Sequence, residues 1–300
     1  MEAAHHRHKH KRGVGLQGLV VLLEANRPTV ETEEGTRFLC YLRGKIKREQ
    51  GRIMVGDQVE ISPTDPGEAI ITKVYPRINL LFRPPVANVS GLFVIFTLLQ
   101  PPGNLELLDK RLVMAHVLDV DAEIVLTKTD IIADGDNLAR FIGLYEAIGY
   151  HVWETSALTG RGLPELDHSF RTGLWVMVGE SGAGKSSLVK AMLPDEKVAV
   201  QDLSRIGRGQ QTTRWVRLLK VHDFWLADTP GYTALDMSVK DPRRIRSAFW
   251  EWADASCRFP DCFHIDEPGC DVLPKVRLGL YDPTRYQHYR LILQKWVRFY

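Results

Sequence analysis

Short apolar runs separated by turn-forming residues characterise the chain from about residue 13 to residue 80. The intervening Pro, Gly, Asn and Asp residues predict close turns, and the apolar runs predict strands at 19–23, 38–42, 58–61 and 69–72. Several short strands with close turns are typical of a small β-barrel, so we predict an OB-fold over residues 13–80. Cys40 lies inside an apolar run, where we expect a small buried side chain.

From residue 84 the pattern changes to longer apolar runs that alternate with segments of helical period. This alternation predicts a parallel α/β sheet over residues 84–240. The predicted strands are 92–99, 122–126, 151–153, 174–178, 215–221 and 224–227, and the predicted helices are 105–118, 137–148 and 187–193. In a last module, residues 241–300, helices are predicted at 243–253 and 286–298. The fold class is therefore multidomain.

Residues 179–187 match the pattern G-x-x-x-x-G-K-[ST] of a phosphate-binding loop, with a predicted strand before them and a predicted helix after them. In such a loop, backbone N–H groups surround a phosphate at the positive end of a helix. We expect Lys185 to contact the β- and γ-phosphates and Ser186 to bind Mg²⁺. A Gly-rich turn is the purely structural alternative. The predicted nucleotide contacts here are Gly179, Glu180, Ser181, Gly182, Ala183, Gly184, Lys185, Ser186 and Ser187.

Two segments before this loop resemble the parts of GTPases that read guanine. Residues 127–130, Thr-Lys-Thr-Asp, approach the pattern N-K-x-D, and Ser-Ala follows the next predicted strand. The Asp130 carboxylate can accept from the N1–H and 2-amino groups of guanine, whereas adenine offers neither donor there. The stem of Lys128 would cover the base. A strand followed by a polar turn is the alternative. The predicted guanine contacts are Thr127, Lys128, Thr129, Asp130, Ser156 and Ala157.

Two segments after the phosphate loop are expected to meet the γ-phosphate and magnesium. In the polar loop 204–214, Thr212 or Thr213 would supply a second hydroxyl ligand of Mg²⁺. Asp228 begins the sequence Asp-Thr-Pro-Gly and would hold Mg²⁺ through water, while Gly231 would donate its N–H to the γ-phosphate. The Asp-Thr-Pro-Gly sequence is also compatible with a plain turn.

The motifs stand in an unusual order, because both base-reading segments precede the phosphate loop. The same sheet can be built by a chain cut at a different loop, so the order predicts a circularly permuted GTPase domain over residues 84–240. Tyr232 follows Gly231, where Ras-like enzymes carry a glutamine that positions the attacking water. An aromatic ring cannot do this, and slow intrinsic hydrolysis is expected.

Three of the four cysteines lie close together near the C-terminus, with the spacing C-x4-C-x-H-x5-C. Three thiolates and one imidazole suit a single structural Zn²⁺ in a zinc-binding helical module, and a module of this size needs such a staple. Free thiols in a loop are the alternative. The close spacing of these three cysteines favours metal binding in a reducing compartment over disulfide bonds. The predicted ligands are Cys257, Cys262, His264 and Cys270.

The net charge of +2 says little about partners, and the chain has no apolar run approaching the ~18 residues of a membrane span. Because no apolar segment follows the basic start, we expect no signal peptide, no membrane and a cytoplasmic protein.

Residues 1–12 are rich in His, Arg and Lys, which indicates a flexible tail, an arm that touches RNA or a metal-binding histidine tract. A solvated loop or a phosphate-contacting edge explains the basic residues Arg43, Lys45, Lys47, Arg48 and Arg52.

Permuted GTPase motifs, a β-rich N-terminal domain and a Cys3His tail together resemble the small ribosomal subunit biogenesis GTPase family, RsgA or YjeQ. The likeness extends from about residue 14 and includes Val55-Gly56-Asp57, residues 83–88 and Glu267-Pro268-Gly269-Cys270. The resemblance implies GTP hydrolysis on the small ribosomal subunit late in its maturation. It also implies that the OB and zinc domains contact rRNA.

Two positions depart from the family pattern. Thr127 stands where the family usually has Asn, and Gln211 replaces a histidine that the resemblance implies in hydrolysis. We expect guanine selectivity to survive, and we hypothesise that Gln211 orients the attacking water once the ribosome orders its loop. The residues expected to act in catalysis are thus Lys185, Gln211, Thr213 and Asp228.

The leading interpretation is a monomeric GTP hydrolase that binds GTP or GDP, the small ribosomal subunit and its rRNA. A nucleotide-dependent RNA-binding scaffold with negligible turnover is the first alternative. A P-loop ATPase or small-molecule kinase is the second, and Asp130 argues against it.

Overall fold

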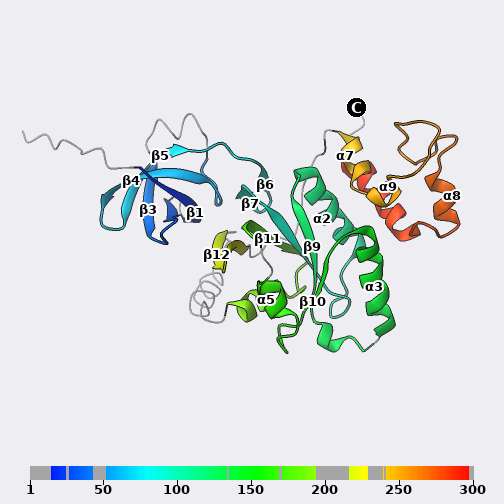
Figure 1. Cartoon of the computed structure of the whole chain (residues 1–300), viewed down its shortest axis with the longest axis horizontal. Coiled ribbons are helices and arrows are strands. Elements are labelled where there is room, and N and C mark those ends of the chain that lie inside the picture. The colour runs from blue at the N-terminus through cyan, green and yellow to red at the C-terminus, as the bar shows by residue number, and fades with distance from the viewer. Residues whose placement is uncertain are drawn as a thin grey trace, which may run out of the picture. The chain divides into compact units, whose positions relative to one another are not determined.

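The computed structural model describes residues 15–24, 27–42, 52–133, 135–168, 171–193, 216–228, 239 and 241–296. Contacts divide the chain into two compact units, Met1–Ile78 and Asn79–Tyr300 (Figure 1). The GTPase-like part and the C-terminal module lie within the second unit. The predicted boundary between them at residue 240 stays a prediction.

The first unit is a five-stranded barrel. Its strands pair in the order β1-β2-β3-β5-β4, and pairing of β1 with β4 closes the ring. All pairs are antiparallel except β3 with β5. The strands are β1 (Leu16–Glu24), β2 (Arg27–Thr32), β3 (Arg37–Leu42), β4 (Gln58–Asp65) and β5 (Glu68–Val74). This confirms the barrel that the short apolar runs predict.

Alternate positions of the barrel strands point inward and form its core, which includes Val20, Val30, Val59 and Ile71. Cys40 is fully buried among them, as expected, and burial raises the pKa of its thiol to about 12. The pattern missed β2, because Arg27 and Pro28 suggest a turn. In the structure both residues belong to the strand: Arg27 pairs with Glu24, and Pro28 pairs with Leu23.

The second unit contains a six-stranded sheet in the order β10-β9-β8-β11-β13-β12. Neighbours from β10 to β13 are parallel, and only β12 runs antiparallel to its neighbour. The strands are β8 (Gly91–Phe96), β9 (Asp121–Leu126), β10 (Val152–Glu154), β11 (Gly173–Gly179), β12 (Arg217–Val221) and β13 (Phe224–Asp228). A separate ribbon, β6 (Leu80–Phe82) with β7 (Pro85–Ala87), precedes them.

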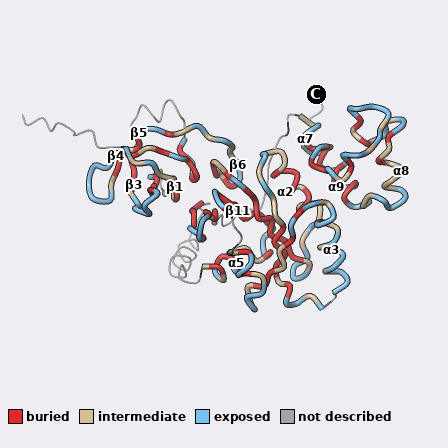
Figure 2. The backbone as a smooth tube through the Cα atoms, in the orientation of Figure 1, coloured by how far each residue is buried: buried red, intermediate tan, exposed pale blue. Residues whose placement is uncertain are grey.

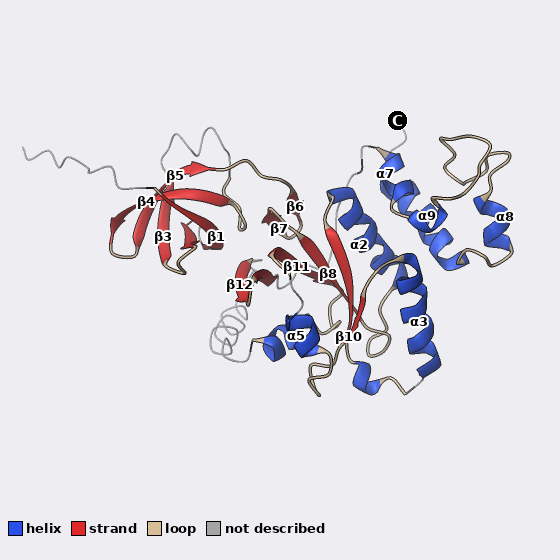
Figure 3. Cartoon of the chain, in the orientation of Figure 1, coloured by secondary structure: helices blue, strands red, loops and turns tan. Residues whose placement is uncertain are grey.

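Helices cover both faces of this sheet (Figure 3). Helices α2 (Leu105–Leu118) and α3 (Gly135–Ile148) lie on one face, and α4 (Leu163–His168) and α5 (Lys185–Met192) pack on the other. Every residue of β8 is buried, as expected for a strand covered on both sides (Figure 2). The apolar run that predicts this strand continues to Leu99, but pairing stops at Phe96 because the chain turns there toward α2.

The C-terminal module consists of α7 (Pro242–Ser247), the single-turn η3 (Trp250–Trp252), α8 (Val272–Arg277) and α9 (Pro283–Trp296). The one helix predicted over 243–253 is thus two short helices, because the first ends at Ser247. Helices α7 and α9 pack against α2. No helix among the described residues has the length and apolar character needed to cross a membrane.

Candidate nucleotide site and metal centre

The predicted nucleotide-binding segments follow the carboxyl ends of neighbouring parallel strands (Figure 1). The Thr-Lys-Thr-Asp segment follows β9, the Ser-Ala segment follows β10, the phosphate loop follows β11, and β13 ends at Asp228. Parallel strands that lie side by side bring such segments to one edge of a sheet, which is where ligands of α/β sheets bind. Segments far apart in the chain therefore share one site.

Thr127 and Lys128 connect the base-reading segment directly to the phosphate loop. The Thr127 hydroxyl donates to Ala183 O at 2.6 Å and lies 3.1 Å from Phe96 O. Lys128 adopts a left-handed conformation, and its Nζ donates to Gly182 O at 2.9 Å and to Gln100 O. Thr127 is 4% exposed, so its short side chain fills the space between β8 and the loop.

Thr129, the third residue of the Thr-Lys-Thr-Asp segment, connects that segment to the chain just before the Ser-Ala segment. The backbone N–H and the hydroxyl of Thr129 both donate to Thr155 O, at 3.2 and 3.1 Å. Ser156 is fully buried, and its hydroxyl accepts from the N–H of Thr159. Asp130 is exposed, so its carboxylate is open to a ligand, and Ala157 is half-buried.

The phosphate loop has the backbone that its glycines predict. Gly182 and Gly184 have φ values of 80° and 97°, a region that residues with a Cβ avoid. A Cβ on Gly184 would also lie 3.3 Å from the Thr127 hydroxyl. Gly184 then caps α5 without a side chain, so the first N–H groups of α5 are available to an anion.

Lys185 opens helix α5 and turns back over the loop. Its Nζ donates to Gly179 O and Glu180 O, both at 2.7 Å. Burial, with a further contribution from the charge of Arg111, lowers the pKa of Lys185 to about 8. The lysine that would meet the phosphates is thus held as a partly desolvated cation.

At the end of β13, Asp228 forms an ion pair of 3.5 Å with Arg217 of β12. Ser186 and Ser187 are exposed on the first turn of α5. The expected roles of Gln211, Thr212, Thr213 and Gly231 fall on residues outside the described part of the chain, as does Tyr232. The described half of the site therefore contains the base-reading and phosphate-binding groups.

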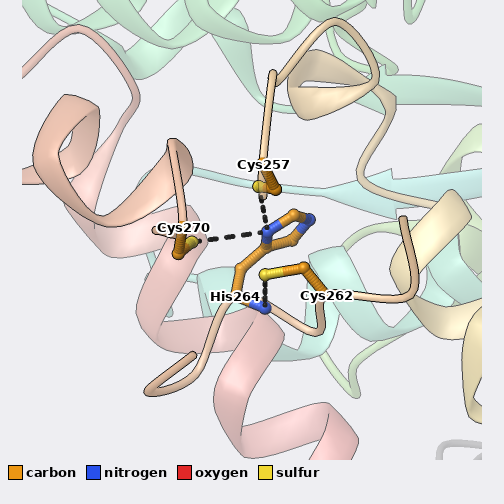
Figure 4. A group of neighbouring side chains, drawn as sticks. All are labelled: Cys257, Cys262, His264 and Cys270. Atoms are coloured by element: carbon orange, nitrogen blue, oxygen red, sulfur yellow. Dashed lines mark hydrogen bonds between the residues drawn. The ribbon is translucent and has the colours of Figure 1, made fainter. Parts of the chain in front are cut away.

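The four predicted metal ligands converge in the C-terminal module (Figure 4). One ligand atom from each lies within 4.8 Å of the others. His264 Nδ1 is 3.5 Å from Cys257 Sγ and 3.6 Å from Cys270 Sγ. A tetrahedral metal bound at ordinary bond lengths would separate sulfur from nitrogen by about 3.6 Å. The residues thus fit one tetrahedral metal ion.

Backbone groups around this cluster also suit bound thiolates. Cys262 Sγ accepts from the N–H of His264, and Cys257 Sγ accepts from the N–H of Asp271. Glu267 closes the loop by accepting from the N–H groups of Phe263 and Ile265 at 2.7 and 2.8 Å. Without a cation, burial raises the pKa of Cys262 to about 12. A metal ion supplies the positive charge that favours the thiolate.

A buried ion cluster joins the C-terminal module to α2. Asp109 is fully buried and accepts from Arg285 Nη1, from His288 Nδ1 at 2.6 Å and from the Tyr145 hydroxyl at 3.0 Å. Arg285 also pairs with Glu251 at 2.8 Å. Burial, together with the charge of Asp109, raises the pKa of Tyr145 well above its ordinary value.

A cavity of about 320 Å³ opens beside Asp109 and is lined by residues of α2, α3 and α9. The sequence analysis missed the cluster, although it contained a signal. Asp109 and Arg111 are charged residues in the middle of a helical segment rich in apolar residues, and both are buried. Charges at buried positions of a helix need partners or a function.

A family model described as RsgA GTPase matches residues 74–238. Proteins named small ribosomal subunit biogenesis GTPase RsgA from Thermotoga maritima and Moorella thermoacetica are 38% and 39% identical to the chain over 279 and 264 residues. These alignments cover 91% and 87% of this chain, and 94% and 90% of the two relatives.

Two crystal structures resemble the whole chain. YjeQ from Thermotoga maritima superposes with a TM-score of 0.81 at 34% identity, covering 96% of this chain and all of YjeQ. YloQ, described as a circularly permuted GTPase, superposes with a TM-score of 0.77 at 28% identity and covers 99% of this chain. The likeness therefore extends over the barrel, the sheet and the C-terminal module.

Proposed function

Because this chain belongs to the RsgA GTPase family, we propose that its GTP hydrolysis acts as a switch in late maturation of the small ribosomal subunit. The chain is a GTP hydrolase with a circularly permuted GTPase domain. The ribosomal part of the proposal is supported by the names of relatives that match most of its length. We further propose that it works as a monomer in the cytoplasm, binds the rRNA of that subunit and is activated by it.

One observation carries the assignment of the nucleotide site. Thr127 and Lys128 donate hydrogen bonds to Ala183 O and Gly182 O, so the segment that would read guanine and the loop that would hold phosphates form one surface. In this proposal Asp130 binds the guanine edge and Ala157 donates its N–H to O6. Lys185 and the loop backbone bind the phosphates, while Ser186 binds the Mg²⁺ that accompanies GTP. Asp228 would hold that Mg²⁺ through water.

We propose that the Cys3His cluster binds one structural Zn²⁺. Three thiolates and an imidazole form a closed set with no open position, which suits a structural ion and leaves no place for a reacting water. Tyr286 and Tyr289 of α9 donate to His264 O and Phe263 O at 2.7 and 2.6 Å. A bound ion would therefore also fix α9.

The test is GTP turnover with purified small subunits, with large subunits and with neither. We expect slow turnover alone, a large increase with small subunits and none with large subunits. Equal turnover in all three samples would contradict the ribosomal role while leaving the GTPase assignment in place. Nucleotide-dependent binding to small subunits without any stimulated turnover would instead favour a scaffold.

For Gln211, we propose that it orients the attacking water when the subunit is bound. Gln211→Ala should lower subunit-stimulated turnover at least tenfold, because positioned acid, base or water-orienting groups contribute about 10²–10⁴-fold to catalysis. GDP affinity should be unchanged, which serves as the control for folding. Near-normal stimulated turnover would remove the idea.

A further inference from the structure

Arg111 of α2 is a buried cation to which the proposed mechanism gives no role. Arg111 is 2% exposed, and its Nε and Nη1 atoms have no hydrogen-bond partner among the residues that the structure describes. Burying a charged group without a full set of partners destabilises a folded protein. Such a side chain is retained most simply where a ligand supplies the missing charge.

The position of Arg111 on α2 directs it toward the phosphate loop. It lies seven residues after the N-cap Asn104, which is almost two full turns, so both lie on the same face of the helix. The backbone N–H of Asn104 donates to Glu180 Oε2 at 2.8 Å. Long side chains of a helix lean toward its N-terminus, which brings the guanidinium toward Glu180.

The charges around the loop agree with this placement. Burial lowers the pKa of Arg111, whereas the carboxylate of Glu180 raises it. The same guanidinium contributes to the lowered pKa of Lys185. The buried Arg111 and the half-buried Lys185 thus share the field of one carboxylate, so among these three described groups positive charge is in excess.

We infer that Arg111 is a positioning residue for the nucleotide, whose charge favours a triphosphate over a diphosphate. The inference rests on the proposed nucleotide site. A triphosphate brings one more anionic group than a diphosphate, and charges interact over longer distances in a partly buried site than in water. Arg111 acts through this field, and no direct contact with a phosphate is required.

The test variant is Arg111→Met, which removes the charge and keeps a long side chain. The nucleotide-free protein should melt at a higher temperature, because an incompletely paired buried charge is removed. The affinity for a non-hydrolysable GTP analogue should fall about tenfold, as expected for one charge at intermediate distance, and GDP affinity should fall less. The ratio of the two affinities is the readout that a merely structural role would leave unchanged.

Two matched variants serve as controls. Arg111→Lys keeps the charge and should keep a ratio close to that of the wild type. Lys110→Met removes a neighbouring charge that pairs with Glu106 at 3.6 Å, and it should leave the ratio unchanged.

A lower melting temperature of Arg111→Met with an unchanged affinity ratio would overturn the inference and assign Arg111 to structure alone. A wild-type protein that binds neither nucleotide would overturn the nucleotide site, and this inference with it. A wild type that binds both, with an Arg111→Met variant of identical ratio, would overturn this inference only.

Discussion

Asp130 is the residue on which guanine recognition rests in the proposed site. It is exposed, and the neighbouring Thr129 is fixed by two hydrogen bonds to Thr155 O. The backbone that carries Asp130 is thereby held next to Thr155, and a carboxylate can accept two hydrogen bonds from guanine.

Asp130→Asn should change the preferred base from guanine to xanthine. The amide can donate to the oxygen that xanthine carries in place of the 2-amino group, whereas the guanine amino group would lose its acceptor. We expect GTP affinity to fall at least 100-fold and XTP affinity to rise, measured by competition with a fluorescent nucleotide. Asp223→Asn, in the exposed turn between β12 and β13, is the control. Unchanged base preference in Asp130→Asn would contradict the assignment.

In the proposed site, Lys185 should make nucleotide binding dependent on pH. Its pKa in the free protein is lowered to about 8, and phosphates bind the ammonium form. Below pH 8 Lys185 already carries its proton. Above pH 8 most of the free protein has lost this proton and must take it up again when nucleotide binds, so nucleotide affinity should decline with rising pH. GDP titrations from pH 7 to about 8.8 should show this decline. Lys190→Met, an exposed position on the same helix, should leave the profile unaltered, and a flat wild-type profile would argue against Lys185.

At the scale of elements, α2 occupies a central place in the second unit. Residues two apart on a helix point about 200° apart, so Asp109 and Arg111 lie on opposite sides. Asp109 meets α9 through Arg285 and His288, while Arg111 lies on the face of Asn104, whose N–H holds the phosphate loop. One helix therefore contacts both the proposed phosphate site and the metal-binding module.

Asp109→Asn should weaken the attachment of the C-terminal module. Removing one partner of a buried ion pair costs about 3–5 kcal/mol, because the remaining charge stays buried. A decrease of roughly 6–12 °C in melting temperature is expected for a unit of this size. Glu106→Gln breaks a more exposed pair with Lys295 and should cost less than about 1 kcal/mol. Equal effects of the two substitutions would show that Asp109 contributes no more than a surface ion pair.

At the scale of the whole molecule, the candidate metal site and α9 are linked. Tyr286 and Tyr289 hold the ligand loop, and the residues directly before them in the chain, Arg285 and His288, hold Asp109. Loss of the metal should therefore reach beyond the ligand loop to α9 and α2.

Removal of the metal by a strong chelator should increase hydrogen exchange in 241–296 and in α2, because coordination supplies folding energy to such modules. The barrel strands should keep their protection, since they lie in the other compact unit. Restoring zinc should restore protection. Exchange confined to the ligand loop would contradict the link to α2.

Local chemistry made much of this protein predictable from its sequence. The glycines at 182 and 184, the apolar run of β11 and the spacing of the Cys3His cluster all depend on residues close in the chain. The structure gives the two glycines positive φ, makes the run a strand and brings the four side chains of the cluster together. The permuted order of motifs also left the site predictable, because parallel strands bring their carboxyl ends together whatever the order of the loops.

Tertiary structure alone decided which buried charges meet. Asp109 and Arg285 are separated by 176 residues, and no periodicity relates them. Burial in an ion pair depends on two surfaces packing together, so it follows from the assembled fold and is absent from any local pattern. The same holds for Arg111. Its sequence pattern indicates a helix, and only the assembled fold brings it near Glu180 of the phosphate loop.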